Sequence, residues 1–208
     1  MKESITAVIL AGGRSSRMQY RDKGLMVLND RSMISHIAER LSSQVKDILI
    51  SANNNLEQYA KYSYRVLPDE HQDYRGPMAG ICEALKVIDT QFLLVVPCDG
   101  PLLPLDLASR LENQVLQKKA SLATVYDGQY KQPTYSLIQV DMLHSALEFL
   151  ARGERKLGLW LKENNAELVD FSDQPNAFVN INSDADLEKL TAIILENAVA
   201  IYCGPLKH

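Results

Sequence analysis

Short apolar runs separated by helical stretches constrain the fold of this chain more than any other feature of its sequence. Met33, Ile34, Ile37, Ala38 and Leu41 show the three- and four-residue spacing of an amphipathic helix. The predicted strands are residues 7–10, 48–50, 65–67, 92–96, 122–126, 135–140 and 168–171. The predicted helices are residues 33–41, 78–88, 107–115, 142–150 and 187–195. Such alternation favours a Rossmann-like α/β fold, with a mostly parallel sheet and helices on both faces.

The size and composition of the chain indicate one domain. A length of 208 residues is enough for one sizeable core and too short for two. Hydrophobic residues make up 46% and charged residues 23%, which is typical of a soluble globular domain. We therefore expect a single domain over residues 1–208, ending in a flexible tail at residues 202–208.

Charge and cysteine content exclude several classes of protein. The formal net charge of -4 argues against general binding to nucleic acid or to anionic membranes. There is no signal-peptide pattern and no apolar stretch near the ~18 residues that span a bilayer, so we expect a cytoplasmic protein. Cys82, Cys98 and Cys203 form neither a disulfide framework nor a zinc motif. We interpret Cys98 as a packing residue.

A cationic, glycine-containing loop follows the first predicted strand. Gly12 and Gly13 come directly after Leu10 and Ala11, and glycines at the carboxyl end of a strand let the backbone approach a ligand closely. Successive backbone N–H groups in such a turn can bind an anion. Residues 14–23 hold three arginines and one lysine against one carboxylate, a local charge of +3. The loop is a candidate site for a nucleotide triphosphate; the alternative is a solvated basic turn.

An aspartate follows the most apolar run in the chain. Residues 92–96 are the best candidate for a central strand, and Asp99 lies just beyond it. Ligands of open α/β sheets bind beyond the carboxyl ends of the strands, so Asp99 is expected to face the same crevice as Gly12 and Gly13. A carboxylate there suits Mg²⁺, which proteins usually hold with one or two carboxylates and substrate phosphates. The alternative is an ordinary turn aspartate.

Three further groups are candidate binding residues. Asp69 follows a short predicted strand and is placed to face the same crevice. Gly76 and Gly80 lie at the predicted start of a helix, where backbone N–H groups favour an anion or a polar base edge. Close helix packing is the alternative for Gly80. Asn180 and Asn182 alternate in an extended segment and project from one face, either into the site or toward a helix cap.

Several motifs, taken in order, resemble the molybdenum cofactor guanylyltransferase family over nearly the whole chain. The matching segments are Leu10-Ala11-Gly12-Gly13, Arg17-Met18, Asp22-Lys23, residues 76–80, Pro97-Cys98-Asp99, Gln132-Pro133-Thr134, residues 153–156 and residues 178–182. Together they are far more specific than any one of them. The resemblance implies a fold like that of the nucleotide-diphospho-sugar transferases.

The resemblance also implies an activity and a set of site residues. The implied reaction transfers GMP from GTP to the terminal phosphate of molybdopterin, or of the molybdenum cofactor, and releases pyrophosphate. The implied catalytic residues are Lys23, Arg17 and Asp99, of which Asp99 holds Mg²⁺. The implied nucleotide-binding residues are Leu10, Ala11, Gly12, Gly13, Lys23, Ser51, Asn53, Asp69, Gly76, Gly80 and Asp99. Asn180 and Asn182 fall on the pterin side, and cofactor-insertion proteins and acceptor molybdoenzymes are the implied protein partners.

The chain departs from the family pattern in two places. Gln19-Tyr20-Arg21 stands where the family often has glycines between its Arg-Met and Asp-Lys pairs. The family tends to place an asparagine after the second strand, where this chain reads Ser51-Ala52-Asn53. The nucleotide contact there therefore falls to Ser51 or to Asn53.

Two other functions stay open on the sequence. One is a cytidylyl- or sugar-nucleotidyltransferase of similar fold, although such relatives often show Leu-Ala-Ala-Gly where this chain has Leu10-Ala11-Gly12-Gly13. The other is a non-catalytic nucleotide- or cofactor-binding protein. The presence of both Lys23 and Asp99 argues against it.

Overall fold

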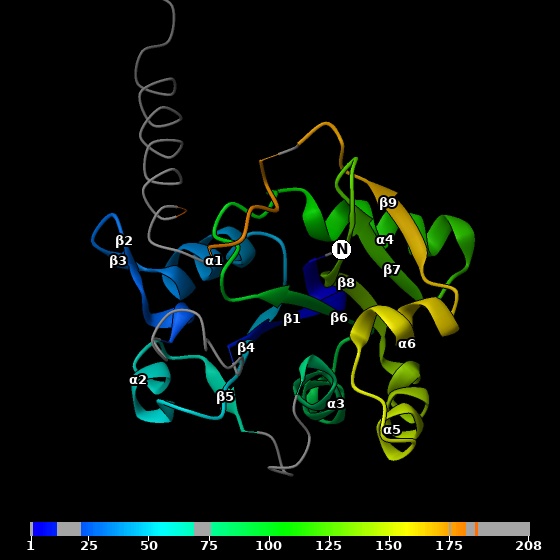
Figure 1. The fold of residues 1–208 in the computed structure, drawn as a ribbon, viewed down its shortest axis with the longest axis horizontal. Coiled ribbons are helices and arrows are strands. Elements are labelled where there is room, and N and C mark those ends of the chain that lie inside the picture. Colours follow the sequence, from blue (N-terminus) through cyan, green and yellow to red (C-terminus); the bar gives the residue numbers. More distant parts are fainter. Residues whose placement is uncertain (1, 12–21, 69–75, 175, 182–185, 187–208) are drawn as a thin grey trace, which may run out of the picture.

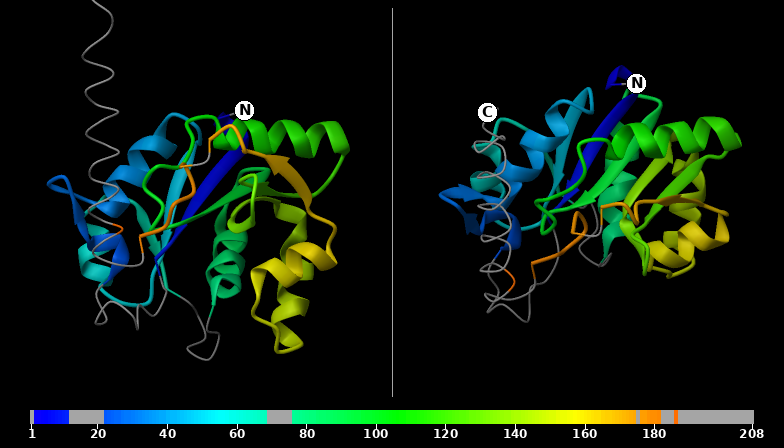
Figure 2. Two further views of the ribbon diagram at one scale, coloured as in Figure 1. Left: turned by 45° about the horizontal axis from the view of Figure 1, so that its top comes forward. Right: turned by 90° about the horizontal axis from the view of Figure 1, so that it is seen from above.

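A computed structural model describes residues 2–11, 22–68, 76–174, 176–181 and 186. Over these residues the chain forms one seven-stranded sheet covered by helices on both faces, as Figures 1 and 2 show. The strands of the sheet are β1 (Ile5–Leu10), β4 (Asp47–Ser51), β5 (Arg65–Leu67), β6 (Phe92–Pro97), β7 (Leu122–Tyr126), β8 (Lys131–Gln139) and β9 (Glu167–Asp170). The α/β class expected from the sequence is confirmed.

The helices cover the sheet in two layers. They are α1 (Met33–Ser42), α2 (Leu56–Ala60), α3 (Pro77–Val87), α4 (Leu107–Lys118), α5 (Leu143–Ala151) and α6 (Leu157–Glu163). Apolar side chains of α1 and α4 share one core cluster, and those of α3, α5 and α6 share a second. Strand β1 separates the two layers, because Ala7 and Ile9 belong to the first cluster and Val8 to the second. This two-sided burial explains the nearly continuous apolar runs of the strands.

The strand order is β5-β4-β1-β6-β8-β7-β9, and only β8 runs against its neighbours. Consequently β4, β1 and β6 lie side by side and parallel, with their carboxyl ends at one edge. The predicted strand through Val140 ends one residue earlier, because Val140 begins the 3₁₀ helix η4 (Val140–Met142).

Strand β8 carries an irregularity beside its partner β7. Thr124 pairs with Ser136, whereas the next residue, Val125, pairs with Gln132, so residues 133–135 are left out of the ladder. Proline has no N–H group to donate to a ladder, and Pro133 lies in this stretch. Such bulges bend a strand and redirect its side chains. Tyr135 lies in this stretch, and its side chain is buried.

Several elements were not expected from the sequence. They are the 3₁₀ helices η1 (Lys2–Ser4) and η3 (Lys23–Leu25), the hairpin of β2 (Val27–Leu28) and β3 (Arg31–Ser32), and helices α2 and α6. Each is short, with at most seven residues. A periodic pattern needs a longer window than this to stand out. The predicted helix 187–195 and the expected tail at residues 202–208 lie outside the described residues.

Candidate functional site

Three adjacent strands end together at one edge of the sheet. The backbone N–H of Ala11, just past β1, donates to the carbonyl of Ser51 at the end of β4 (2.8 Å). The N–H of Cys98, just past β6, donates to the carbonyl of Leu10 (3.2 Å). These bonds hold the loops after the three strands side by side at the place where open α/β sheets bind their ligands. Cys98 is itself buried in the core, in agreement with its interpretation as a packing residue.

Lys23 and Asp99 meet at this edge. The Lys23 ammonium donates a hydrogen bond to Asp99 Oδ2 at 2.9 Å. The two side chains are only 20% and 17% exposed, so both charges lie partly out of solvent while an edge of each remains accessible. The structure thus brings together two residues that the sequence singled out separately. A positive and a negative group at one point can contact both a phosphate and a cation.

Asp22 fixes the position of Lys23. It is the N-cap residue of η3, and its Oδ1 accepts from the N–H of Gly24 (3.2 Å) and from the Tyr59 hydroxyl. Its Oδ2 accepts from the side-chain amide of Asn55 (3.0 Å). Burial, followed by the hydrogen bond to Asp22, raises the pKa of Tyr59 well above its usual range. The buried tyrosine is therefore a permanent donor that anchors the backbone next to Lys23.

Sequence reasoning missed Asn55 and Tyr59 as parts of this arrangement. Both belong to the α2 region, which was not predicted as a helix. One local signal is the glycine that follows Lys23. A Cβ on Gly24 would lie 2.5 Å from the Tyr59 hydroxyl oxygen, so no larger residue fits there without a shift. Glycine lets another group approach the backbone closely, so a glycine directly after a candidate catalytic lysine is such a signal.

Ser51 and Gly80 are packed against each other. Ser51 is 5% exposed. A Cβ on Gly80, inside α3, would lie 2.1 Å from Ser51 Oγ and 3.4 Å from a terminal methyl carbon of Leu10. This close approach matches the packing alternative for Gly80. Asn53, by contrast, is exposed in the loop after β4, so the two candidates for the nucleotide contact differ in accessibility.

Gly76 begins α3 in a conformation that favours glycine. It is the N-cap residue of the helix, with φ of 134°, and Pro77 occupies the first helical position. Proline there loses no hydrogen bond, because the first N–H groups of a helix have no partner within the helix. The sequence suggested that the N–H groups of this first turn contact an anion, and the observed helix start places them at Gly76 and the residues after Pro77.

The segment that carries Asn180 lies beside Asp99. The N–H of Ile181 donates to the carbonyl of Asp99 at 3.0 Å. Ile181 is buried with Leu28 and Met33, which ties this late segment to the β2–β3 hairpin and the start of α1. The residue predicted for the second substrate therefore lies next to the backbone of Asp99, the residue predicted to hold the metal.

Part of the predicted site lies outside the described residues. This applies to Gly12, Gly13, Arg17, Asp69 and Asn182, and to the unusual segment Gln19-Tyr20-Arg21.

The donor set at the edge fits a Mg²⁺ ion that is shared with substrate. Asp99 supplies one accessible carboxylate, and the part of the chain that the structure describes holds no cluster of three or more His, Cys, Asp or Glu side chains for a metal. A magnesium ion commonly takes one carboxylate and completes its shell with phosphate oxygens and water. A metal site built entirely from protein ligands finds no support among these residues.

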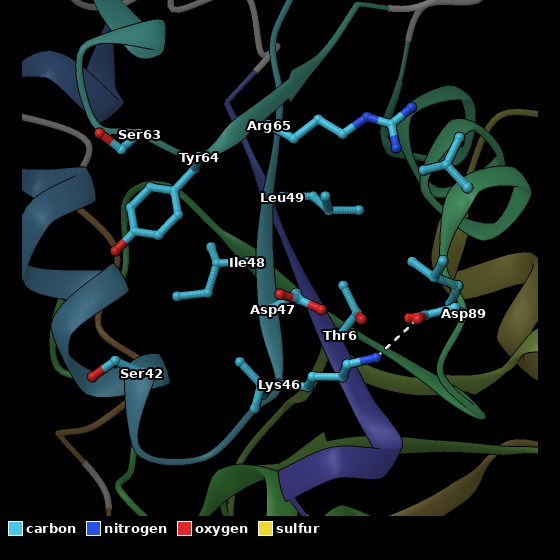
Figure 3. A pocket seen from close by; sticks show the side chains of 13 residues that line it. Thr6, Ser42, Lys46, Asp47, Ile48, Leu49, Ser63, Tyr64, Arg65 and Asp89 are labelled. Carbon is cyan, nitrogen blue, oxygen red and sulfur yellow. Dashed lines mark hydrogen bonds and ion pairs between the residues drawn. The ribbon is translucent and has the colours of Figure 1, made fainter.

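A separate hollow of about 510 Å³ lies at the opposite edge of the sheet. Figure 3 shows that Lys46 and Asp89, which form an ion pair at 2.8 Å, border it together with Arg65. It lies where β4 begins rather than where the strands end, and the residues of the candidate site do not line it. None of the helices in the described ranges is long and apolar enough to cross a membrane.

The mostly parallel sheet, with Lys23 and Asp99 at its carboxyl edge, and the family match together define this protein as a nucleotidyltransferase. Residues 7–168 match the MobA-like NTP transferase domain, and the chain belongs to that family. It is 44% identical over 196 residues to the molybdenum cofactor guanylyltransferase of Shewanella sp. (strain W3-18-1), which covers 94% of this chain and 100% of the relative.

Solved structures show the same fold. Molybdopterin-guanine dinucleotide biosynthesis protein A from Archaeoglobus fulgidus superposes with a TM-score of 0.78 at 18% identity, over 92% of this chain and 99% of that one. A nucleotidyl transferase from Methanothermobacter thermautotroptrophicus gives 0.73 at 20% identity, over 93% and 98%. The nucleotidyltransferase fold expected from the sequence motifs is confirmed.

Proposed function

We propose that this enzyme transfers GMP from GTP to the terminal phosphate of molybdopterin and releases pyrophosphate. The product is the guanine dinucleotide form of the cofactor. The observation that carries the proposal is the contact between Lys23 and Asp99 at the carboxyl edge of the sheet. The 44% identity to a relative named molybdenum cofactor guanylyltransferase supports this choice of substrates.

The chemistry requires charge neutralisation more than a strong base. An oxygen of the pterin phosphate attacks the α-phosphorus of GTP, a new P–O bond forms, and the P–O bond to pyrophosphate breaks. The attacking phosphate is already an anion near neutral pH. The barrier lies in bringing two polyanions together, so positioning and electrostatic stabilisation are expected to dominate catalysis.

Lys23 and Asp99 take complementary roles in this scheme. Lys23, together with Arg17, contacts the phosphates and offsets the charge that develops on the leaving pyrophosphate. Asp99 would hold Mg²⁺, which neutralises charge on phosphate oxygens when it is bound. The ion pair of the free protein keeps the lysine at the edge, because the anchored Asp22 backbone and the Asp99 carboxylate hold it from two sides. GTP then replaces Asp99 as the partner of the ammonium group.

The remaining candidates divide between the two substrates. The proposed nucleotide side comprises Leu10, Ala11, Gly12, Gly13, Ser51, Asn53, Asp69, Gly76 and Gly80. Asn180 and Asn182 are assigned to the pterin. Cofactor-insertion proteins and acceptor molybdoenzymes would supply the substrate and receive the product.

The test compares nucleotides and acceptors directly. Purified protein is incubated with molybdopterin, Mg²⁺ and GTP, CTP or ATP, while pyrophosphate release and the mass of the product are followed. We expect GTP to be preferred by about 100-fold or more, because a site built for the N–H donors of guanine leaves its polar groups unpaired with other bases. Equal use of CTP, or transfer to a sugar phosphate instead of molybdopterin, would assign one of the rival transferase activities. Binding of GTP without any turnover would indicate a carrier protein.

A further inference from the structure

A buried tyrosine hydroxyl lies directly behind Asp99. Tyr135 is 0% exposed, and its ring packs edge-on against Phe178, with ring centroids 4.9 Å apart. The side chain comes from the irregular stretch of β8. A Cβ on Gly100 would lie 1.8 Å from the Tyr135 hydroxyl oxygen. Gly100 does not have a positive φ, so space rather than backbone conformation requires glycine here. The Tyr135 hydroxyl therefore occupies the space that a side chain at position 100 would fill.

Two buried oxygen atoms beside Gly100 have no hydrogen-bond partner among the described residues. One is the hydroxyl oxygen of Tyr135, and the other is Oδ1 of Asn180. The Asn180 oxygen lies 3.4 Å from the same missing Cβ of Gly100, so both atoms surround one point. A buried polar atom without a partner costs about 1–3 kcal/mol, and native proteins tend to retain one where it serves a function. The hydroxyl can donate and the amide oxygen can only accept, so the two are complementary.

The location of the pair connects it to the proposed reaction. Gly100 follows Asp99 directly, and the N–H of Ile181 donates to the Asp99 carbonyl. Burial, and then the negative charge of Asp99, raise the pKa of Tyr135, which keeps the hydroxyl protonated as a donor. Asn180 is half-buried, and its neighbour Ile181 is hydrogen-bonded to the backbone of Asp99. An amide in that place can present either its oxygen or its NH₂ group to an anion.

We propose that, once GTP is bound, Tyr135 acts as a positioning residue that donates its hydroxyl hydrogen to Asn180 Oδ1 and so turns the Asn180 NH₂ group toward the phosphate of the second substrate. This inference rests on the proposed function. An anionic phosphate repels the amide oxygen and attracts the NH₂ group. Without the Tyr135 hydroxyl, the amide loses the contact that holds its oxygen away from the anion. Gly100 makes the contact possible, because any side chain there would separate the two groups.

The kinetic test uses Tyr135→Phe, which keeps the ring and removes only the hydroxyl. We expect KM for molybdopterin to rise about tenfold, while the affinities for GTP and for Mn²⁺, measured without turnover, change less than about twofold. Asn180→Ala should raise the same KM, and the double variant should be no worse than Asn180→Ala alone. The thermal stability of the free protein should not fall, because there the hydroxyl has no hydrogen-bond partner among the described residues. The matched control is Tyr126→Phe, which removes an exposed hydroxyl bonded to the Gly128 carbonyl.

A second measurement separates this inference from the proposed function. The side-chain amide signals of Asn180, assigned from their absence in Asn180→Ala, are recorded by NMR with Mg²⁺ and GTP bound. We expect these signals to shift and broaden in Tyr135→Phe and to stay unchanged in Tyr126→Phe. Unchanged signals in Tyr135→Phe, or additive kinetic losses in the double variant, would overturn the positioning role. If the signals change but wild-type protein transfers nothing to molybdopterin, the positioning contact stands and the proposed substrate is wrong.

Discussion

The Lys23 ammonium lies 2.9 Å from the Asp99 carboxylate, although 76 residues separate them in the chain. The sequence indicated each residue by a different argument, the lysine by its cationic loop and the aspartate by the apolar strand before it. Their contact shows that the two residues belong to one site. It also means that each residue holds the other in place before substrates arrive, which shapes the first two predictions.

Replacing Lys23 with alanine should nearly abolish transfer while the fold survives. Lys23 carries a positive charge at the edge where two polyanions must meet, and the loss of one stabilising group of this kind commonly costs ~100-fold to ~1,000-fold in kcat. The measurement is kcat for pyrophosphate release, with circular dichroism as the check on folding. Lys46→Ala is the control, because Lys46 pairs with Asp89 at the opposite edge. A Lys23 variant with most of its turnover would remove the lysine from the mechanism.

Replacing Asp99 with asparagine should remove the response to Mg²⁺. The amide keeps the size of the side chain but loses the charge that favours a divalent cation. We expect turnover to fall by ~100-fold or more, and Mn²⁺ binding followed by electron paramagnetic resonance to weaken in parallel. Asp89→Asn, in the exposed ion pair with Lys46, is the matched control. If activity and its dependence on Mg²⁺ both persist, Asp99 is only a turn residue.

Alanine at position 80 should destabilise the protein. The added Cβ would lie 2.1 Å from Ser51 Oγ and 2.9 Å from Ser51 Cβ, and overpacking of this kind costs about 1–3 kcal/mol. The free energy of unfolding in urea measures the effect, and Ser51→Ala in the same chain should recover part of it. The control is Gly158→Ala in helix α6, where the nearest atom is Pro133 Cγ at 3.3 Å. A variant of normal stability but weak GTP binding would instead assign Gly80 to the nucleotide.

Replacing both Asn180 and Asn182 with alanine should weaken molybdopterin binding and leave GTP affinity nearly intact. Two amides offer hydrogen-bond donors and acceptors together, which suits the ring edges of a pterin, where donors and acceptors alternate, or its phosphate. The expected loss is about tenfold or more in KM for molybdopterin, at nearly constant melting temperature. Steady-state kinetics with each substrate varied in turn provides the measurement. A loss of stability alone, with normal kinetics in the folded fraction, would favour a helix-capping role for these residues.

The main elements of the fold were predictable because their signal is local. Residues 92–96 became β6, with every residue of the strand buried, and the spacing from Met33 to Leu41 became α1. A strand covered on both faces has to be apolar along its length, and a helix packed on a sheet has to be apolar on one face. Short elements such as α2 and the β2–β3 hairpin carry too few residues for such a pattern. They were missed for that reason.

The sequence by itself determined the class of fold and the chemical character of the edge where Leu10, Ser51 and Asp99 lie. Apolar periodicity depends on neighbours along the chain, so it is legible in one sequence. Only the tertiary structure decided that Tyr59 anchors the residue before Lys23, that Ser51 is packed against Gly80, and that Tyr135 reaches Gly100. Each of these contacts joins residues from separate elements that the strand order brings together, and the contact of Tyr135 also involves the bulged stretch of β8. Those features arise from packing of the whole chain, and no local pattern encodes the distances that result.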